Sequence, residues 1–127
     1  MPRSPLAYLL DIVEACAAIE SALSGLELDA YRANRLVRSA VEREFILIGE
    51  AVASLMRLEP GLSERISHSR RIIGFRNQLA HDYAAVNDTV VWAIASGEVS
   101  VLREECQAIL AERDADGEAD QQAVRAD

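Results

Sequence analysis

The chain has 127 residues and a formal net charge of −8; half of its residues are apolar and only 5% are aromatic. That length predicts one domain with a single hydrophobic core rather than two domains. The many Ala, Leu, Ile, Glu and Arg residues, with few Gly or Pro, favour an all-α fold. The acidic balance argues against a general nucleic-acid-binding protein, although the distribution of charge matters more than its total.

The N-terminal stretch and the two cysteines indicate the cellular compartment of the protein. Asp11 and Glu14 interrupt the first apolar segment, and no apolar run reaches the roughly 18 residues of a membrane span. We therefore expect no signal peptide, no membrane contact and a cytoplasmic protein. Cys16 and Cys106 occupy apolar positions of helical patterns without CxxC spacing, which indicates buried, reduced thiols rather than a disulfide or a metal site.

Apolar residues spaced three and four apart predict two long helices in the first half of the chain. The first covers residues 5–24 and ends near Gly25. The second covers residues 30–57 and is closed by Pro60 and Gly61. A helix as long as the second spans a whole small domain.

The second half of the chain contains the remaining helices. A third helix is expected from about Ser69 to Ala84, and Asn87 or Asp88 can cap the helix that follows. Gly97 is expected to divide the last apolar pattern into two helices. Four to five helices joined by short loops predict an up-and-down bundle.

The end of the chain differs from the rest in composition. Residues 111–127 carry six acidic side chains against Arg113 and Arg125 and hold few apolar residues. Such a segment cannot bury enough apolar surface to offset the entropy lost on ordering. We therefore expect a helical bundle over residues 1–110 and a disordered acidic tail over residues 111–127.

The third predicted helix carries positive charge on an acidic chain. Residues 65–81 contain no acid, but they hold both histidines and four arginines, namely Arg65, Arg70, Arg71 and Arg76. Taken singly, each of the first three is most simply an ordinary solvated side chain. Together they form a local basic face.

Arg76 lies on the apolar stripe of this helix, in line with Ile72 and Leu79. A guanidinium there points inward or into an interface, and it is costly to bury without a partner. The simplest interpretation is a structural ion pair with an acid on another helix, such as Glu44 or Glu50.

A second polar stripe holds His81 and Asn77, which precedes it by four residues and can reach its ring. Tyr83 alone could be a core aromatic residue with its hydroxyl at the surface. The combination is more informative than any one member. The sequence "RNQLAHDY", residues 76–83, resembles the RX4HXY motif of HepT-like toxins in the HEPN superfamily.

The surrounding sequence agrees with this resemblance. The stretches "ILIGEA" at 46–51 and "VNDTVVWAI" at 86–94 are similar to the same family, so the resemblance covers about residues 6–110. One departure is "SHSRRI" at 67–72, where the family often has a Pro–Trp pair before the helix.

The resemblance implies an all-α HEPN-like bundle that forms a homodimer and cleaves RNA without a metal or other cofactor. It implies the toxin of a type VII-like toxin–antitoxin pair, controlled by an MntA-like nucleotidyltransferase antitoxin. Cleavage through a ribose 2′-hydroxyl needs a base, an acid and positive charge on the phosphorane. His81 can act as base or acid, Arg76 can hold the phosphate, and Asn77 can orient the imidazole.

A two-fold dimer would bring two copies of Arg76 and His81 into one composite site that supplies both base and acid. In the family, the partner nucleotidylates the motif tyrosine, which corresponds to Tyr83 here. Phosphates added there would compete with RNA phosphate for Arg76. The candidate RNA contacts are the basic residues Arg65, Arg70 and Arg71.

Two other functions compete with RNA cleavage. Metal chemistry is a poor candidate, because the two histidines are 13 residues apart and no HxxxH or CxxC pair completes a ligand set. The stronger alternative is a catalytically inactive HEPN domain that holds a nucleotide or a partner protein through its basic face. The complete RNxxxHxY set favours the enzyme, since a catalytic site requires charged and titratable groups placed together.

Overall fold

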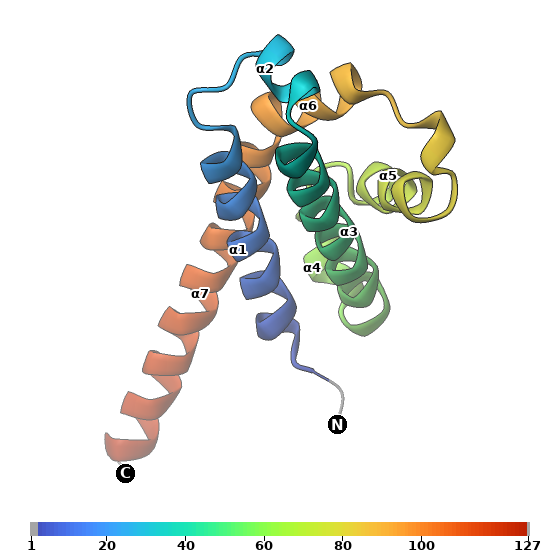
Figure 1. The fold of residues 1–127 in the computed structure, drawn as a ribbon. Coiled ribbons are helices and arrows are strands. Elements are labelled where there is room, and N and C mark those ends of the chain that lie inside the picture. The colour runs from blue at the N-terminus through green and yellow to red at the C-terminus, as the bar shows by residue number, and fades with distance from the viewer. Residues whose placement is uncertain (1–2, 127) are drawn as a thin grey trace.

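The computed structural model describes residues 3–126 of the chain, with side chains described from Arg3 to Asp114. Every regular element within residues 3–126 is helical, which confirms the predicted all-α bundle. Figure 1 shows three long helices packed together and α5 crossing α3 on one side of the bundle. The elements are α1 (Pro5–Leu23), α2 (Leu28–Ala33), α3 (Arg35–Leu58), α4 (Pro60–Ser63), α5 (Ser69–His81), the 3-10 turn η1 (Tyr83–Ala85), α6 (Asp88–Gly97) and α7 (Val99–Ala126).

The first helix forms where the apolar spacing predicts it. The hydroxyl of Ser4 caps α1 by accepting a hydrogen bond from the N–H of Ala7 (3.2 Å). Pro5 fits the first turn, where its missing N–H is not needed. The helix ends at Leu23, and Gly25 adopts a left-handed φ of 76° just beyond it.

The predicted helix over residues 30–57 is divided into α2 and α3 at Asn34. The extended backbone of Asn34 ends α2, and its side-chain oxygen caps α3 by accepting from the N–H of Val37 (3.1 Å). The prediction missed this break because the apolar spacing continues through it. Tyr31 of α2 is fully buried, so this short helix closes one end of the bundle.

The predicted third helix ends at His81 and not at Ala84. Asp82 leaves the helical conformation (φ −138°, ψ 56°), and Tyr83 opens the separate 3-10 turn η1. The apolar spacing does not reveal this end, because alanines follow the motif and favour helix by themselves. Tyr83 is consequently not part of the regular helix that carries Arg76.

The last two helices agree with the sequence signals. The side-chain oxygen of Asn87 caps α6 by accepting from the N–H groups of Thr89 (2.9 Å) and Val90 (3.3 Å). Gly97 ends α6 and α7 begins at Val99, so the predicted division is confirmed.

The core is formed mainly where α1 packs on α3 and α7, and where α3 packs on α5. Its largest fully buried side chains are Tyr31, Leu9, Ile12, Ile19, Ile48, Leu55, Ile109, Val41, Val52, Val91, Val99 and Cys16. Cys16 and Cys106 are both free and buried, as predicted, and burial raises the pKa of each thiol to about 12. They pack as small apolar residues and do not ionise near neutral pH.

The predicted acidic tail, residues 111–127, coincides with the last part of α7. Side chains after Asp114 lie outside the described residues, so the disorder of this tail stays a prediction. None of the helices in the described part of the chain has both the length and the apolar composition that crossing a membrane requires.

Gly49 lets α5 lie directly against α3. A Cβ atom added at Gly49 would stand 2.1 Å from the Cβ of Arg76 and 2.5 Å from its Cγ. Neither contact is sterically possible, and both opposing atoms lie at the base of the side chain, close to the backbone of α5. The crossing of the two helices therefore depends on the absence of a side chain at this position.

Gly49→Ala is accordingly expected to destabilise the protein by about 1–3 kcal/mol, since overpacking outweighs the gain of up to about 1 kcal/mol in helix propensity. Gly74→Ala on the exposed side of α5 is the matched control, because nothing lies within 4 Å of a Cβ added there. It should stabilise the protein by up to about 1 kcal/mol. Urea unfolding compares the two variants; equal stability of both would contradict the close packing.

Candidate functional site

Arg76 lies at the seam between α5 and α3, with 26% of its side chain exposed. Its Nη2 donates to Oε1 of Glu50 on α3 (3.2 Å), and its Nη1 donates to Oδ1 of Asn77 (3.0 Å). The predicted ion pair is confirmed, with Glu50 rather than Glu44 as its partner. These contacts fix the position of the guanidinium while leaving part of it open to solvent.

Asn77 is exposed and contacts Arg76 rather than His81. Its side-chain oxygen accepts the hydrogen bond from Arg76, and no hydrogen bond joins it to the imidazole within the described residues. The expected contact between Asn77 and the ring of His81 is therefore not made. The physical reason is the neighbouring guanidinium, whose charge makes it the stronger donor for the amide oxygen.

His81 is the last residue of α5 and its side chain is exposed. The turn that follows is held from two sides: the N–H of Asp82 donates to the carbonyl of Gln78 (2.9 Å), and the Gln78 side chain donates to the carbonyl of Ala85 (3.2 Å). These bonds close the chain back on α5 directly after the histidine. The imidazole thus projects from an ordered helix end, where a substrate can reach it.

Tyr83 is 60% exposed and lies beside charged groups of α3 and α6. The negative charge of Glu42 raises the pKa of the Tyr83 hydroxyl, with smaller effects of partial burial and of Asp88. Arg38 opposes this shift. The hydroxyl therefore belongs to an acidic environment around Glu42, and the acids raise rather than lower its pKa.

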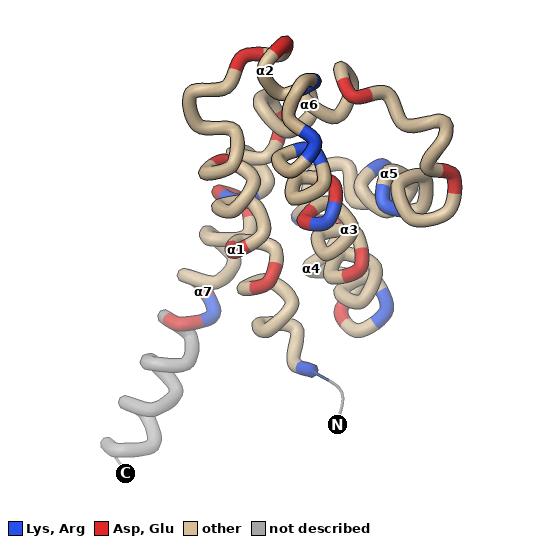
Figure 2. The backbone as a smooth tube through the Cα atoms, in the orientation of Figure 1, with Lys and Arg blue, Asp and Glu red and all other residues tan. Residues whose placement is uncertain are grey.

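The three other candidate arginines differ in their surroundings. Arg65 donates two hydrogen bonds to the carboxylate of Glu112 on α7 (2.7 and 2.8 Å), so its charge is already paired. Arg70 and Arg71 are exposed on α5. Figure 2 shows positive charge on α5 and charge of both signs on the neighbouring α3. The predicted basic face is thus narrower than the sequence implied.

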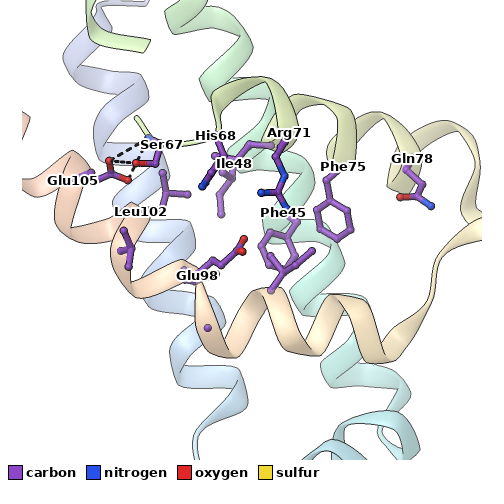
Figure 3. A pocket seen from close by; sticks show the side chains of 15 residues that line it. Phe45, Ile48, Ser67, His68, Arg71, Phe75, Gln78, Glu98, Leu102 and Glu105 are labelled. Carbon is purple, nitrogen blue, oxygen red and sulfur yellow. Dashed lines mark hydrogen bonds between the residues drawn. The ribbon is translucent and has the colours of Figure 1, made fainter. Parts of the chain in front are cut away.

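Arg71 lines a cavity of about 490 Å³ between α3, α5 and the junction of α6 and α7. In Figure 3, the side chains of Arg71 and Glu98 extend into the cavity from opposite sides. Phe45 and Phe75 contribute to its apolar lining, with their rings edge to face and 5.2 Å apart. Glu105 at the far end accepts from the N–H (3.1 Å) and the hydroxyl (2.9 Å) of Ser67.

The departing sequence "SHSRRI" forms an irregular start to α5. His68 has a left-handed backbone (φ 63°, ψ 32°), which is uncommon for a residue other than glycine. Ser69 stabilises the turn, because its hydroxyl donates to the carbonyls of Ser63 (2.7 Å) and Ile66 (3.0 Å). The side chain of His68 is exposed and lines the cavity beside Arg71.

Sequence reasoning missed Glu42, Gly49 and the cavity. Glu42 lies on the buried face of α3 with 7% exposure, three residues before Phe45. The sequence held a signal for both residues. Glu42 is a charged residue at the spacing of the buried apolar ones, and Gly49 is a glycine inside a long helix. The cavity combines residues distant in sequence and had no local signal.

The described residues also bear on metal binding. Among them, no three His, Cys, Asp or Glu side chains are grouped closely enough to hold a metal ion. The site instead combines a positioned guanidinium, an exposed imidazole and an exposed phenol around the end of one helix. Such groups can bind a phosphate, transfer protons and accept a covalent modification.

Comparison with known proteins identifies the family of the chain. The model of the HepT-like ribonuclease family matches residues 12–109, which include the whole motif and most of the bundle. The chain therefore belongs to the HepT-like ribonuclease family.

Curated relatives are similar over most of their length. A protein of Methanocaldococcus jannaschii named "Putative RNase MJ1216" is 28% identical over 113 residues, covering 87% of this chain and 91% of the relative. A protein of Caldanaerobacter subterraneus named "Putative RNase TTE0752" is 27% identical over 112 residues, covering 85% of this chain and 96% of the relative. No solved structure matches the chain significantly.

The ion pair between Arg76 and Glu50 is expected to contribute little to stability. Its side chains are 26% and 49% exposed, so solvent screens the attraction. A double-mutant cycle with Arg76→Ala and Glu50→Gln, followed by urea unfolding, should give a coupling of about 0.2–1 kcal/mol. A coupling well above this range would contradict the conclusion that Arg76 is positioned for another task.

Proposed function

We propose that the protein is a metal-independent endoribonuclease and the toxin of a type VII-like toxin–antitoxin pair. Membership of the HepT-like ribonuclease family and the names of its relatives support RNA as the substrate. The observation that carries the proposal is the presence of Arg76 and His81 on one helix. The guanidinium is held by Glu50 on α3, and the imidazole projects from the helix end.

In this mechanism the 2′-hydroxyl of a ribose attacks the adjacent phosphorus. One His81 accepts the proton of the hydroxyl, and a second histidine protonates the departing 5′ oxygen. Arg76 stabilises the negative charge that develops on the phosphorane oxygens. Asn77 acts as a positioning residue for Arg76, because its oxygen accepts from the guanidinium (3.0 Å).

A homodimer supplies the second histidine. His81 follows Arg76 by five residues, so the two lie about 140° apart around α5 and roughly 7.5 Å apart along its axis. This separation favours a phosphate shared between two protomers over one held by a single chain. Two copies related by a two-fold axis would present the four side chains to one RNA strand. A stable monomer in light scattering that still cleaves RNA would contradict this composite site.

RNA contacts outside the reacting phosphate are proposed for Arg70 and Arg71, with a lesser part for Arg65. Arg70 and Arg71 are exposed on the helix that carries the motif, whereas Arg65 is already bound to Glu112. An arginine that is already paired with a carboxylate binds a phosphate less favourably, because the existing ion pair must first be broken. The cavity beside Arg71 gives an RNA strand room next to this face.

His81→Ala is expected to abolish RNA cleavage and toxicity while leaving the fold intact. The side chain is exposed, so its loss removes a proton-transfer group worth about 10²–10⁴ in rate and little packing. Cleavage is measured with EDTA present, and the melting temperature provides the control. Cleavage at the wild-type rate would make His81 dispensable and favour the inactive HEPN domain that only binds a partner or nucleotide.

Control of this activity is proposed to occur through Tyr83. An MntA-like nucleotidyltransferase antitoxin would transfer AMP to its hydroxyl, which is 60% exposed and open to an enzyme. The added phosphate and adenosine would fill the space at the end of α5 beside His81. The added negative charge would also repel the RNA backbone from Arg76 and its neighbours.

Tyr83→Phe is therefore expected to escape modification while retaining at least part of the nuclease activity. The change keeps the aromatic ring and removes only the acceptor oxygen. Intact-mass spectrometry after incubation with the nucleotidyltransferase and ATP should find AMP-sized additions on the wild type and none on this variant. Tyr8→Phe is the control, since its residue lies on α1. Equal additions on wild type and Tyr83→Phe would show that a residue other than Tyr83 is modified.

A further inference from the structure

The cavity between α3, α5 and the junction of α6 and α7 has the size and the lining of a small-molecule site. Its volume of about 490 Å³ lies within the range of roughly 300–1,000 Å³ that ligand pockets have. Most of its lining residues are apolar, and they include Phe45 of α3, Phe75 of α5 and Leu102 of α7. A few polar side chains complete the lining, which is the combination that fixes the orientation of a bound ligand.

Two opposite charges extend into this cavity without neutralising each other. Arg71 of α5 and Glu98 at the junction of α6 and α7 reach in from opposite sides, as Figure 3 shows. Both side chains are exposed, and neither forms an ion pair within the described residues. The other acid of the lining, Glu105, already accepts hydrogen bonds from the N–H (3.1 Å) and the hydroxyl (2.9 Å) of Ser67. The cavity therefore offers a ligand one guanidinium donor and one carboxylate acceptor.

Both charged residues stand on ordered backbone. The N–H of Glu98 donates to the carbonyl of Ile94 (2.9 Å), and the carbonyl of Glu98 accepts from the N–H of Leu102 (3.2 Å). Glu98 is thereby tied to α6 and to α7 at once. Arg71 lies inside the regular helix α5, one turn before Phe75, so the guanidinium stem and the ring share one face of that helix. The two charges thus project from fixed positions.

The rings of Phe45 and Phe75 form an aromatic part of the lining. They meet edge to face, with their centroids 5.2 Å apart. Phe75 is half-buried, so part of its ring is open to a ligand. Proteins that recognise single-stranded RNA stack its bases on aromatic side chains and bind the base edges with charged or polar groups. The cavity holds both kinds of group.

An RNA strand at the proposed catalytic residues would pass this cavity. The lining residue of α5 nearest to His81 is Gln78, three residues earlier and about 4.5 Å along the helix axis. The side chain of Gln78 also donates to the carbonyl of Ala85 (3.2 Å), in the turn that follows the histidine. A base within the cavity would therefore belong to a nucleotide a few positions from the one that is cut.

We propose that the cavity binds a guanine base of the RNA substrate and so contributes to the choice of the cleavage site. This inference rests on the proposed ribonuclease function. Guanine carries two acceptors, O6 and N7, on one edge, and Arg71 donates to both, which is the commonest specific contact between a protein and a base. Guanine also carries two neighbouring N–H donors, at N1 and N2, which match the two oxygens of the Glu98 carboxylate. The face of the base stacks on Phe75.

The same two charged groups disfavour the other bases. Adenine has an amino donor at N6 where guanine has O6, so it would turn a donor toward the guanidinium of Arg71. Its N1 is an acceptor and would face the carboxylate of Glu98. Cytosine and uracil each have a single nitrogen that donates, so they can satisfy only one of the two carboxylate oxygens. Guanine alone supplies two acceptors to one side and two donors to the other.

Titration with mononucleotides, followed by NMR of the backbone amides, tests the site without RNA cleavage. GMP should shift the amide signals around Arg71 and Glu98 and bind on the order of tenfold more tightly than AMP. Inosine monophosphate lacks the N2 amino group and 7-deaza-GMP lacks N7, so each should bind more weakly than GMP. Equal affinity for GMP and AMP, or shifts confined to another part of the chain, would overturn the inference.

Two alanine variants assign each contact to its side chain. Glu98→Ala should lose the preference for GMP over inosine monophosphate, and Arg71→Ala should lose the preference for GMP over 7-deaza-GMP. Glu104→Ala and Arg43→Ala are the matched controls, since both side chains are exposed and neither lines the cavity. The controls remove the same charges nearby and should keep both preferences. Full preference in Glu98→Ala and Arg71→Ala would contradict the assigned contacts.

Cleavage of RNA in EDTA distinguishes this inference from the proposed function. Single-stranded oligonucleotides with one guanosine at a shifted position should be cut at a constant distance from that guanosine. Cuts that ignore the guanosine would overturn the guanine site in the substrate and leave the ribonuclease intact. Selective binding of GMP without any RNA cleavage would overturn the ribonuclease and, with it, RNA as the source of the guanine, leaving a free guanine nucleotide as the ligand.

Discussion

The close contact of α5 with α3 at Gly49 determines the geometry of the whole site. Without a side chain at this position, the Cβ of Arg76 rests directly on the backbone of α3. The next residue of α3, Glu50, then reaches the guanidinium, and the edge-to-face pair of Phe45 and Phe75 packs farther along the same seam. The position of α5 in turn determines where its C-terminal end projects His81. One glycine thus connects the packing of the core to the chemistry at the surface.

The sequence predicted those features that depend on local rules. The end of α1 and the start of α6 follow from Gly25 and Asn87, whose turn and capping preferences act within a few residues. The acid paired with Arg76 could be narrowed to two candidates, because a half-buried guanidinium requires one. The break at Asn34 was missed, since its side chain ends one helix and caps another without disturbing the apolar spacing.

The groups around Tyr83 could not be predicted, because they come from three separate helices. Glu42 belongs to α3, Asp88 to α6 and Tyr31 to α2, and only the packed fold brings them together. A tyrosine assigned to the regular helix would have pointed along α5 in line with Arg76. The chain leaves the helix after His81 instead, and Tyr83 opens the separate turn η1. Under our proposal, modification of Tyr83 just beyond the helix end can therefore obstruct the groups on α5 that cleave RNA.

The most direct test of the central claim is the chemistry of the RNA ends produced in EDTA. Attack by the ribose 2′-hydroxyl predicts a 2′,3′-cyclic phosphate on one fragment and a 5′-hydroxyl on the other, as read by mass spectrometry of an oligonucleotide product. A single 2′-deoxynucleotide at the cleaved position should block that cut, and His81→Ala should block every cut. Products with a 3′-hydroxyl and a 5′-phosphate, or cleavage that EDTA abolishes, would contradict the proposed metal-independent mechanism.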